Sequence, residues 1–262
     1  MIRRAAFVVM LLALAAPAHA GVTAADLKAV AAEPPVDAAL PLDLAFTDDT
    51  GVARSLRDAL GGKPAVLIFA DYTCRTLCGP ILDFAAAALR QSGLQPGSDF
   101  RLVAIGLDPK DRSDAARAMR VERIGTDDPL ARTAVVLTGQ APAIASATAA
   151  LGYRYAYDAA HDQYAHPAAA YVLDAQGKVT RVLSGLGLSG NDMRLALVAA
   201  GQGNVGSLGD RIRLLCYGYD PVRGIYTERI TLMLEIAAAI TVAALGGAIL
   251  LMNAVMRWRS AP

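Results

Sequence analysis

Short apolar runs alternate with amphipathic stretches along the middle of this chain. Continuous apolar runs are typical of strands that are buried on both faces. With two weaker stretches, these runs predict strands over residues 42–46, 65–70, 102–107, 134–137, 168–173 and 179–183. Alanine-rich stretches with helical spacing predict helices over residues 55–60, 81–89, 111–120, 141–151 and 191–199. Strands that alternate with helices and end in a hairpin predict an α/β fold, with a central sheet covered on both faces.

The first twenty residues have the pattern of an export signal. Arg3 and Arg4 precede an apolar run, and Ala18-His19-Ala20 supplies the small residues that a signal peptidase requires. As a membrane anchor the run would be too short, since spanning a bilayer takes ~20 apolar residues. We therefore expect cleavage before Gly21 and exclude residues 1–20 from the folded domain.

The other end of the chain predicts a single transmembrane helix over residues 230–256. No charged residue occurs from 236 to 252, and this length suits one bilayer crossing. Residues 257–262 begin with Arg-Trp-Arg, and basic residues favour the cytoplasmic side while Trp favours the headgroup layer. We expect a cytoplasmic tail here, with the globular part in the periplasm beside the bacterial inner membrane.

Residues 41–205, between these ends, have the size of one domain. Residues 21–40 are rich in alanine, proline and acidic residues, which predicts a linker, and residues 206–229 form a juxtamembrane segment. The formal net charge is only +1, and the basic residues are scattered without interleaved aromatics. We therefore expect no nucleic-acid partner.

Cys74 and Cys78 stand where the apolar run 65–70 gives way to a predicted helix. At this spacing both sulfurs lie on one face if the helix begins near Cys74. The N–H groups and dipole of a helix N-terminus favour the thiolate, which is both the nucleophilic and the metal-ligating form. The pair therefore predicts a redox dithiol or a metal site, and a structural disulfide is the third interpretation in an oxidising compartment.

His166 lies just before the apolar run 168–173. A single histidine in such a place is most often a surface or hydrogen-bonded residue, and His161, beside Asp162, has that interpretation. Two thiolates and one imidazole, by contrast, would form a three-coordinate soft site that suits copper(I) and can also hold copper(II).

Three segments, taken in order, resemble the Sco/SenC family: AVLIFADYTCRTLCGPIL, GLDPKDR and YAHPAAAYVLDAQGKV. The members are thioredoxin-fold proteins that bind copper and assist maturation of the binuclear copper centre of cytochrome c oxidase. The resemblance covers about residues 40–200 and implies a thioredoxin-like fold with a central mixed sheet. It implies Cys74, Cys78 and His166 as copper ligands, and it matches Asp108-Pro109 to a family loop. The implied partner is the copper-site subunit of the oxidase.

The chain departs from the family pattern in several places. The family commonly has proline directly after each cysteine, whereas Arg75 follows the first here and Gly79-Pro80 follows the second. Pro167 replaces the small polar residue that usually follows the histidine. Many members are anchored by an N-terminal helix, whereas the predicted span of this chain is C-terminal.

These features predict a membrane-anchored copper chaperone that delivers copper to the copper centre of a respiratory cytochrome oxidase. The alternative is a thiol–disulfide oxidoreductase that reduces the cysteines of that copper site, in which Cys74 attacks and Cys78 resolves the mixed disulfide. A third hypothesis is a peroxide-reducing enzyme on the same fold. Such enzymes commonly place Thr three residues before the reactive cysteine, where this chain has Asp71.

Cys216 is the remaining cysteine, and it precedes the predicted span. No second Cys or His lies close to it in the sequence. We therefore interpret it as an unpaired or interfacial cysteine, with a third sulfur ligand or a cross-chain disulfide as alternatives.

Overall fold

The computed structural model describes residues 28–74, 80–184, 187–202, 205–207, 209–210, 217–220, 225–228 and 230–259. The predicted signal peptide, Arg75, Cys78 and Cys216 lie outside the described residues.

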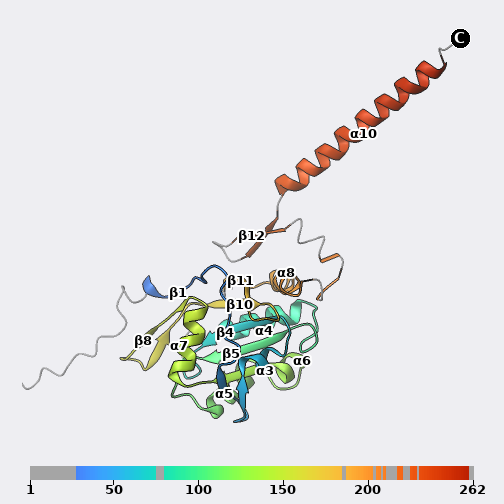
Figure 1. Ribbon diagram of the computed structural model, residues 1–262. Helices are drawn as coiled ribbons and strands as arrows, with labels where there is room; N and C mark the ends of the chain where they lie inside the picture. The colour runs from blue at the N-terminus through green and yellow to red at the C-terminus, as the bar shows by residue number, and fades with distance from the viewer. Residues whose placement is uncertain are drawn as a thin grey trace, which may run out of the picture.

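A seven-stranded mixed sheet forms the centre of the domain, in the order β11-β10-β4-β5-β6-β2-β3 (Figure 1). Its strands are β2 (Ala45–Asp48), β3 (Ala53–Ser55), β4 (Ala65–Ala70), β5 (Arg101–Gly106), β6 (Val135–Thr138), β10 (Ala169–Leu173) and β11 (Val179–Ser184). Strands β4, β5 and β6 run parallel, and the other pairings are antiparallel. All of β4 is buried, as its unbroken apolar run predicts.

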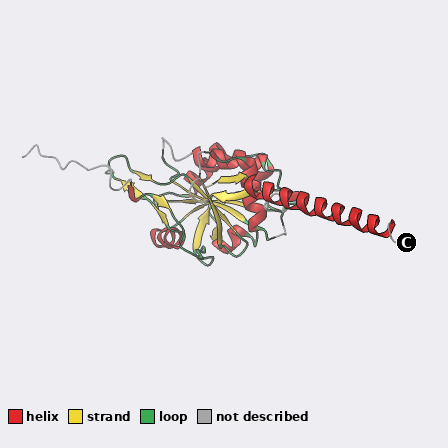
Figure 2. Cartoon of the chain, turned by 90° about the horizontal axis from the view of Figure 1, so that it is seen from above, coloured by secondary structure: helices red, strands yellow, loops and turns green. Residues whose placement is uncertain are grey.

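Helices cover both faces of this sheet (Figure 2). On one face lie α4 (Pro80–Gln91), α5 (Ser113–Met119), the π-turn η1 (Arg120–Ile124), α6 (Pro129–Thr133) and α8 (Gly190–Ala200). On the other lie α3 (Leu56–Leu60) and α7 (Ala141–Ala150). Val66 and Ile68 of β4 pack into the first layer, whereas Leu67 and Phe69 pack into the second, because successive strand residues point to opposite faces. The predicted α/β layers are confirmed.

Local signals explain where several helices begin. Ser55 and Asp58 form a reciprocal capping box at the start of α3. Asp128 caps α6 and is followed by Pro129, whose ring suits the first helical position. Ser189 caps α8, because its side chain accepts a hydrogen bond from the N–H of Asp192.

The structure differs from the predicted elements at one edge of the sheet. The strand predicted from residue 42 begins at Ala45, and it lies inside the sheet because β3 pairs with its outer side. The sequence pattern also missed three short strands after α7, which are β7 (Tyr153–Arg154), β8 (Ala156–Asp158) and β9 (Gln163–Ala165). Strands β8 and β9 form a separate antiparallel hairpin.

The predicted linker over residues 21–40 is corrected from residue 31 onward. Strand β1 (Ala31–Ala32) pairs with β7, and Ala38 and Leu40 are buried. A Cβ at Gly152 would lie 2.0 Å from the carbonyl oxygen of Glu33. The N-terminal strand can therefore pack here because Gly152 has no side chain and adopts a positive φ.

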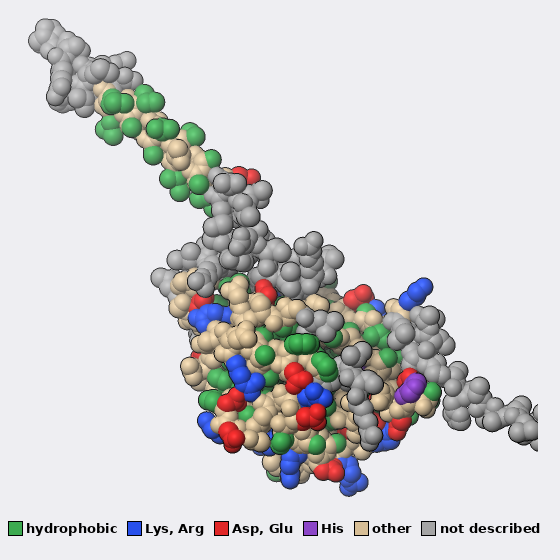
Figure 3. Space-filling model, turned by 180° about the vertical axis from the view of Figure 1, so that it is seen from behind, with side chains coloured by type: hydrophobic (Ala, Val, Ile, Leu, Met, Phe, Trp, Pro, Cys, Tyr) green, Lys and Arg blue, Asp and Glu red, His purple; other side chains and the backbone are tan. Residues whose placement is uncertain are grey.

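A short hairpin, β12 (Tyr217–Asp220) and β13 (Ile225–Glu228), precedes the long helix α10 (Ile230–Arg259). The stretch Glu235–Met252 has a mean hydropathy of 2.0, and none of it is buried against the rest of the structure. Figure 3 shows apolar side chains over this stretch, whereas charged side chains of both signs are interspersed over the visible face of the domain. By length and composition α10 is able to cross a membrane.

Candidate functional site

Cys74 lies at the carboxyl end of β4, in a loop organised by a buried aspartate. Asp71 is fully buried, and its Oδ1 accepts hydrogen bonds from the backbone N–H groups of Thr73 and Cys74, both at 3.1 Å. Its Oδ2 accepts from the N–H of Tyr164 in β9, at 2.8 Å. One carboxylate therefore ties the cysteine loop to the β8–β9 hairpin.

The sulfur of Cys74 is almost completely buried and takes part in a disulfide bond. Its Sγ lies 3.7 Å from Oε1 of Gln163, which the same hairpin supplies. Cys78 lies outside the described residues. Cys74 is therefore present in its oxidised form, and the hairpin covers it.

His166 follows β9 directly, so the same hairpin brings it toward the cysteine loop. Its Nδ1 lies 2.9 Å from the hydroxyl of Tyr153 and 3.3 Å from the carbonyl oxygen of Pro167. Its Nε2 is buried and has no hydrogen-bond partner among the described residues. A buried ring nitrogen without a partner is unusual, because most buried polar atoms are hydrogen-bonded.

The neighbours of Nδ1 determine which ring nitrogen carries the proton. The Tyr153 hydroxyl has a single proton, which it donates to backbone carbonyl oxygens, Pro167 at 3.0 Å and, more weakly, Phe69 at 3.5 Å. The phenol oxygen is then left as an acceptor for Nδ1–H, and the Pro167 carbonyl can only accept as well. The hydrogen bonds therefore favour the tautomer with Nδ1 protonated and with a bare lone pair on Nε2.

Burial lowers the pKa of His166, while the hydrogen bond to Pro167 and the nearby Asp71 carboxylate act in the opposite direction. The neutral imidazole is the form that ligates metals. Asp71 thus interacts with His166 electrostatically and with Cys74 by a hydrogen bond. The structure places these two predicted site residues around one buried carboxylate.

Two further aspartates lie beside this loop. Asp108 and Asp111 are buried after β5, and Oδ2 of Asp111 is buried without a partner among the described residues. Burial, followed by repulsion from Asp108 and Asp71, raises the pKa of Asp111 to about 7. Lys110 bonds to Asp162 of the hairpin turn and lies 3.4 Å from Asp108.

Sequence reasoning missed the supporting residues of this site. Asp71 entered only as evidence against peroxide chemistry, and Gln163 and Tyr153 were not singled out. The two-residue spacing of Tyr153, Tyr155 and Tyr157 was an available signal, since it places side chains on one side of an extended chain. His161 has the role expected of it: it is exposed, and its Nδ1 lies 2.8 Å from Asp158.

Among the described residues no group of three His, Cys, Asp or Glu side chains is placed to hold a metal ion. The proposed third ligand, Cys78, is outside that set. The unpartnered Nε2 of His166 and, once the disulfide is reduced, the sulfur of Cys74 are nevertheless donors of the kind that a soft metal ion takes.

The fold is a thioredoxin-like α/β domain in which Cys74 follows the carboxyl end of β4 and His166 precedes β10. The SCO1/SenC family model matches residues 36–196, which is more than half of the chain. The chain belongs to the SCO1/SenC family. No curated protein matches it significantly.

Solved structures of the family share its fold. A SCO1/SenC family lipoprotein from Bacillus anthracis is 21% identical, with a TM-score of 0.53 over 63% of this chain and 97% of that one. Arabidopsis thaliana ScoI with copper bound is 19% identical, with a TM-score of 0.51 over 61% and 96%. BsSco, described as having a disulfide switch and as one of the cytochrome c oxidase assembly proteins, is 19% identical, with a TM-score of 0.53 over 64% and 96%.

Proposed function

We propose that this protein binds copper through Cys74, Cys78 and His166 and delivers it to the copper-site subunit of a respiratory cytochrome oxidase. The observation that carries this proposal is the buried, unpartnered Nε2 of His166 beside the cysteine loop. Leaving a polar atom buried and unpaired costs free energy, which a metal ion would recover.

The donor set matches copper. Thiolates and imidazole are soft or intermediate ligands, and they select copper(I) more than hard ions such as Mg²⁺. The lowered pKa of His166, caused chiefly by burial, keeps the imidazole neutral and ready to ligate. Family membership supports the same assignment, since a related Arabidopsis protein is known with copper bound.

Helix α10 would hold this site next to its target. A span over residues 235–252 would anchor the domain at the bacterial inner membrane, with the domain on the periplasmic side. Tethering confines donor and acceptor to one surface and raises their effective concentration. Copper would then pass by ligand exchange to an oxidase subunit in the same membrane.

The test is a copper(I) titration of the reduced full-length protein in detergent, against a competing chelator. We expect one tight equivalent, and we expect His166→Ala to weaken binding at least tenfold, or about 1.4 kcal/mol. His161→Ala is the matched control, because His161 is exposed and pairs only with Asp158 among the described residues. Equal affinities of wild type and His166→Ala would refute the three-ligand site.

The disulfide at Cys74 favours a second candidate, a thiol–disulfide oxidoreductase. The reduced protein would attack a disulfide of the target through the Cys74 thiolate and release one target thiolate. The Cys78 thiolate would then displace the second, so that two electrons move to the target while the Cys74–Cys78 disulfide forms. Cys78→Ser would trap the mixed disulfide in this mechanism, and failure to trap any adduct with an oxidised copper-site subunit would exclude it.

A further inference from the structure

A cavity of about 310 Å³ lies at the amino ends of β5 and β6. Since β4 and β5 are parallel and Cys74 follows the carboxyl end of β4, the cavity is at the opposite end of the strands from the cysteine site. Four arginines line it: Arg54 from β3, Arg101 from β5, Arg120 from η1 and Arg132 from α6. Nothing in the proposed copper chemistry uses this cavity.

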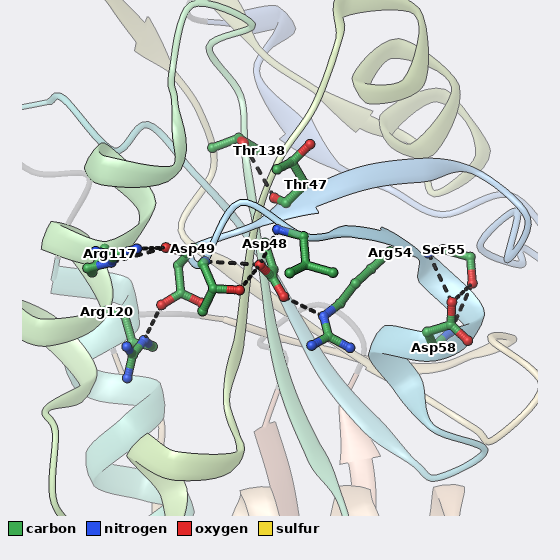
Figure 4. Close-up of polar contacts among 11 residues, drawn as sticks. Thr47, Asp48, Asp49, Arg54, Ser55, Asp58, Arg117, Arg120 and Thr138 are labelled. Atoms are coloured by element: carbon green, nitrogen blue, oxygen red, sulfur yellow. Dashed lines mark hydrogen bonds and ion pairs between the residues drawn. The ribbon is translucent and has the colours of Figure 1, made fainter.

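Two of these arginines are oriented by buried aspartates at the end of β2. Nε of Arg54 donates to Oδ2 of Asp48 at 2.5 Å, and Nε of Arg120 donates to Oδ2 of Asp49 at 2.7 Å (Figure 4). A guanidinium group has five N–H donors. Within the described part of the chain only Nε of each is engaged, so the outer donors of both groups remain for a ligand.

Asp48 offsets the charge of Arg54 but not that of the other arginines, because both of its oxygens are engaged within its own turn and by Arg54. Its carboxylate accepts from the N–H and hydroxyl of Thr50, from the N–H of Val52 and from Arg54. Burial alone would raise the pKa of Asp48, but these hydrogen bonds lower it to about 2. Asp58, which also lines the cavity, is bonded to Ser55.

The other two arginines have no carboxylate within ion-pairing distance among the described residues. Nη1 of Arg101 donates to the carbonyl oxygen of Thr133 at 3.3 Å, and its Nε is buried without a partner. Arg132 is exposed, and among the described residues it bonds only to the carbonyl oxygen of Asp127. The buried Nε of Arg101 costs free energy while it has no partner, and a bound anion would relieve that cost.

We propose that this cavity is a binding site for a small oxyanion that carries phosphate or carboxylate groups. The planar guanidinium fork matches both chemistries, and it binds them with paired hydrogen bonds. Four arginines face three aspartates in the lining, which leaves a net positive charge. The volume of the cavity is at the lower end of the range for small-molecule sites. A small oxyanion is therefore the size of ligand that would fill it.

The experiment measures binding of inorganic phosphate and of succinate to the full-length protein in detergent, by isothermal titration calorimetry at constant ionic strength. We expect saturable binding of at least one of the two anions, with chloride alone as the reference. Arg101→Gln and Arg132→Gln are each expected to weaken it at least fivefold. Arg57→Gln is the matched control, because Arg57 is exposed, pairs with Asp43 and does not line the cavity.

The two anions identify the ligand class: preference for phosphate indicates a phosphate-bearing ligand, and preference for succinate indicates a dicarboxylate. Absence of saturable binding of both anions would overturn the proposal. It would also be overturned if Arg57→Gln weakened anion binding as much as Arg101→Gln and Arg132→Gln do. If Arg101→Gln does not fold, Arg132→Gln decides the question, since its side chain lies at the end of a surface helix. Copper affinity is expected to be unchanged in both variants, so this test is independent of the copper site.

Discussion

The hydroxyl of Tyr153 acts on His166 through a single hydrogen-bonded contact. By giving its proton to the carbonyl of Pro167, it leaves its oxygen to accept from Nδ1 of the imidazole. This contact orients the ring and favours the tautomer with the proton on Nδ1 and a lone pair on the buried Nε2. Groups that orient a metal-binding histidine in this way raise its affinity without touching the metal.

Replacing Tyr153 with Phe tests this role. Loss of one buried hydrogen bond is worth about 0.5–1.5 kcal/mol, so we expect copper(I) affinity to fall by roughly two- to tenfold. Competition titration measures the affinity, and the ¹⁵N chemical shifts of the copper-free protein report the tautomer of His166. Tyr157→Phe is the control, because that exposed hydroxyl bonds to Asp162. Unchanged shifts in Tyr153→Phe would show that the phenol does not set the tautomer.

Asp111 predicts a pH dependence of stability. Its folded-state pKa of about 7 lies above the ordinary value near 3.8, so the folded state holds its proton more tightly than the unfolded state does. This residue therefore costs no stability below about pH 4, and the cost grows as the pH rises to about 7. We expect Asp111→Asn to gain stability relative to wild type between pH 5 and pH 8, by on the order of 1–3 kcal/mol.

Denaturant unfolding at several pH values measures this difference. Asp114→Asn changes an exposed carboxyl in the same segment and is the matched control. A constant difference between Asp111→Asn and wild type over this range would contradict the prediction.

At the scale of elements, the site depends on pieces that come from distant parts of the chain. The β8–β9 hairpin supplies Gln163 and leads into His166, and Asp71 fastens it to the cysteine loop. Strand β1 pairs with β7, which carries Tyr153. The N-terminal strand therefore supports the element that holds the histidine in place.

Gly152→Ala tests the docking of β1. The added Cβ would meet the Glu33 carbonyl at 2.0 Å and would also sit at a positive φ. Gly62→Ala is the control, since Gly62 also has a positive φ but has no atom within 4 Å of the added Cβ. Backbone strain alone lowers the free energy of unfolding by about 1 kcal/mol when alanine replaces glycine at a positive φ. We expect Gly152→Ala to lower it by about 1–3 kcal/mol more than Gly62→Ala does.

Unfolding free energies give the comparison, and proteolysis near residue 31 reports release of the strand. Equal losses in the two variants would mean that β1 contributes no packing of its own.

At the scale of the whole molecule, the surface of the domain is polar, whereas the surface of α10 is apolar. Charged side chains of both signs lie on the visible face of the domain, whereas α10 exposes apolar side chains over Glu235–Met252 (Figure 3). A large exposed apolar surface is unfavourable in water, so a lipid bilayer is the environment that α10 fits.

Ending the chain at residue 229 is expected to move the protein from the membrane fraction to the soluble fraction of a bacterial host. Copper(I) affinity is expected to remain within about threefold of the full-length value, a difference below ~1 kcal/mol, because all three proposed ligands precede that point. Fractionation with immunoblotting measures the distribution. A truncated chain that stays in the membrane fraction would show that α10 is not the anchor.

The sequence by itself determined the layered α/β fold, because buried strands such as β4 are continuous apolar runs and the alternation of elements leaves few ways to bury them. It also singled out Cys74, which follows that strand directly and precedes a predicted helix. It did not settle His166, since one histidine carries no pattern of its own and only resemblance to a family marked it.

Tertiary structure decided what surrounds these residues. The favoured tautomer of His166, its unpartnered Nε2, the bridging role of Asp71 and the raised pKa of Asp111 all depend on contacts between segments that are apart in the chain. The arginine-lined cavity has the same origin, because its four guanidinium groups come from four elements. The periodicity of apolar residues indicates which face of a helix or strand is buried. It does not indicate which polar groups from distant parts of the chain contact that face.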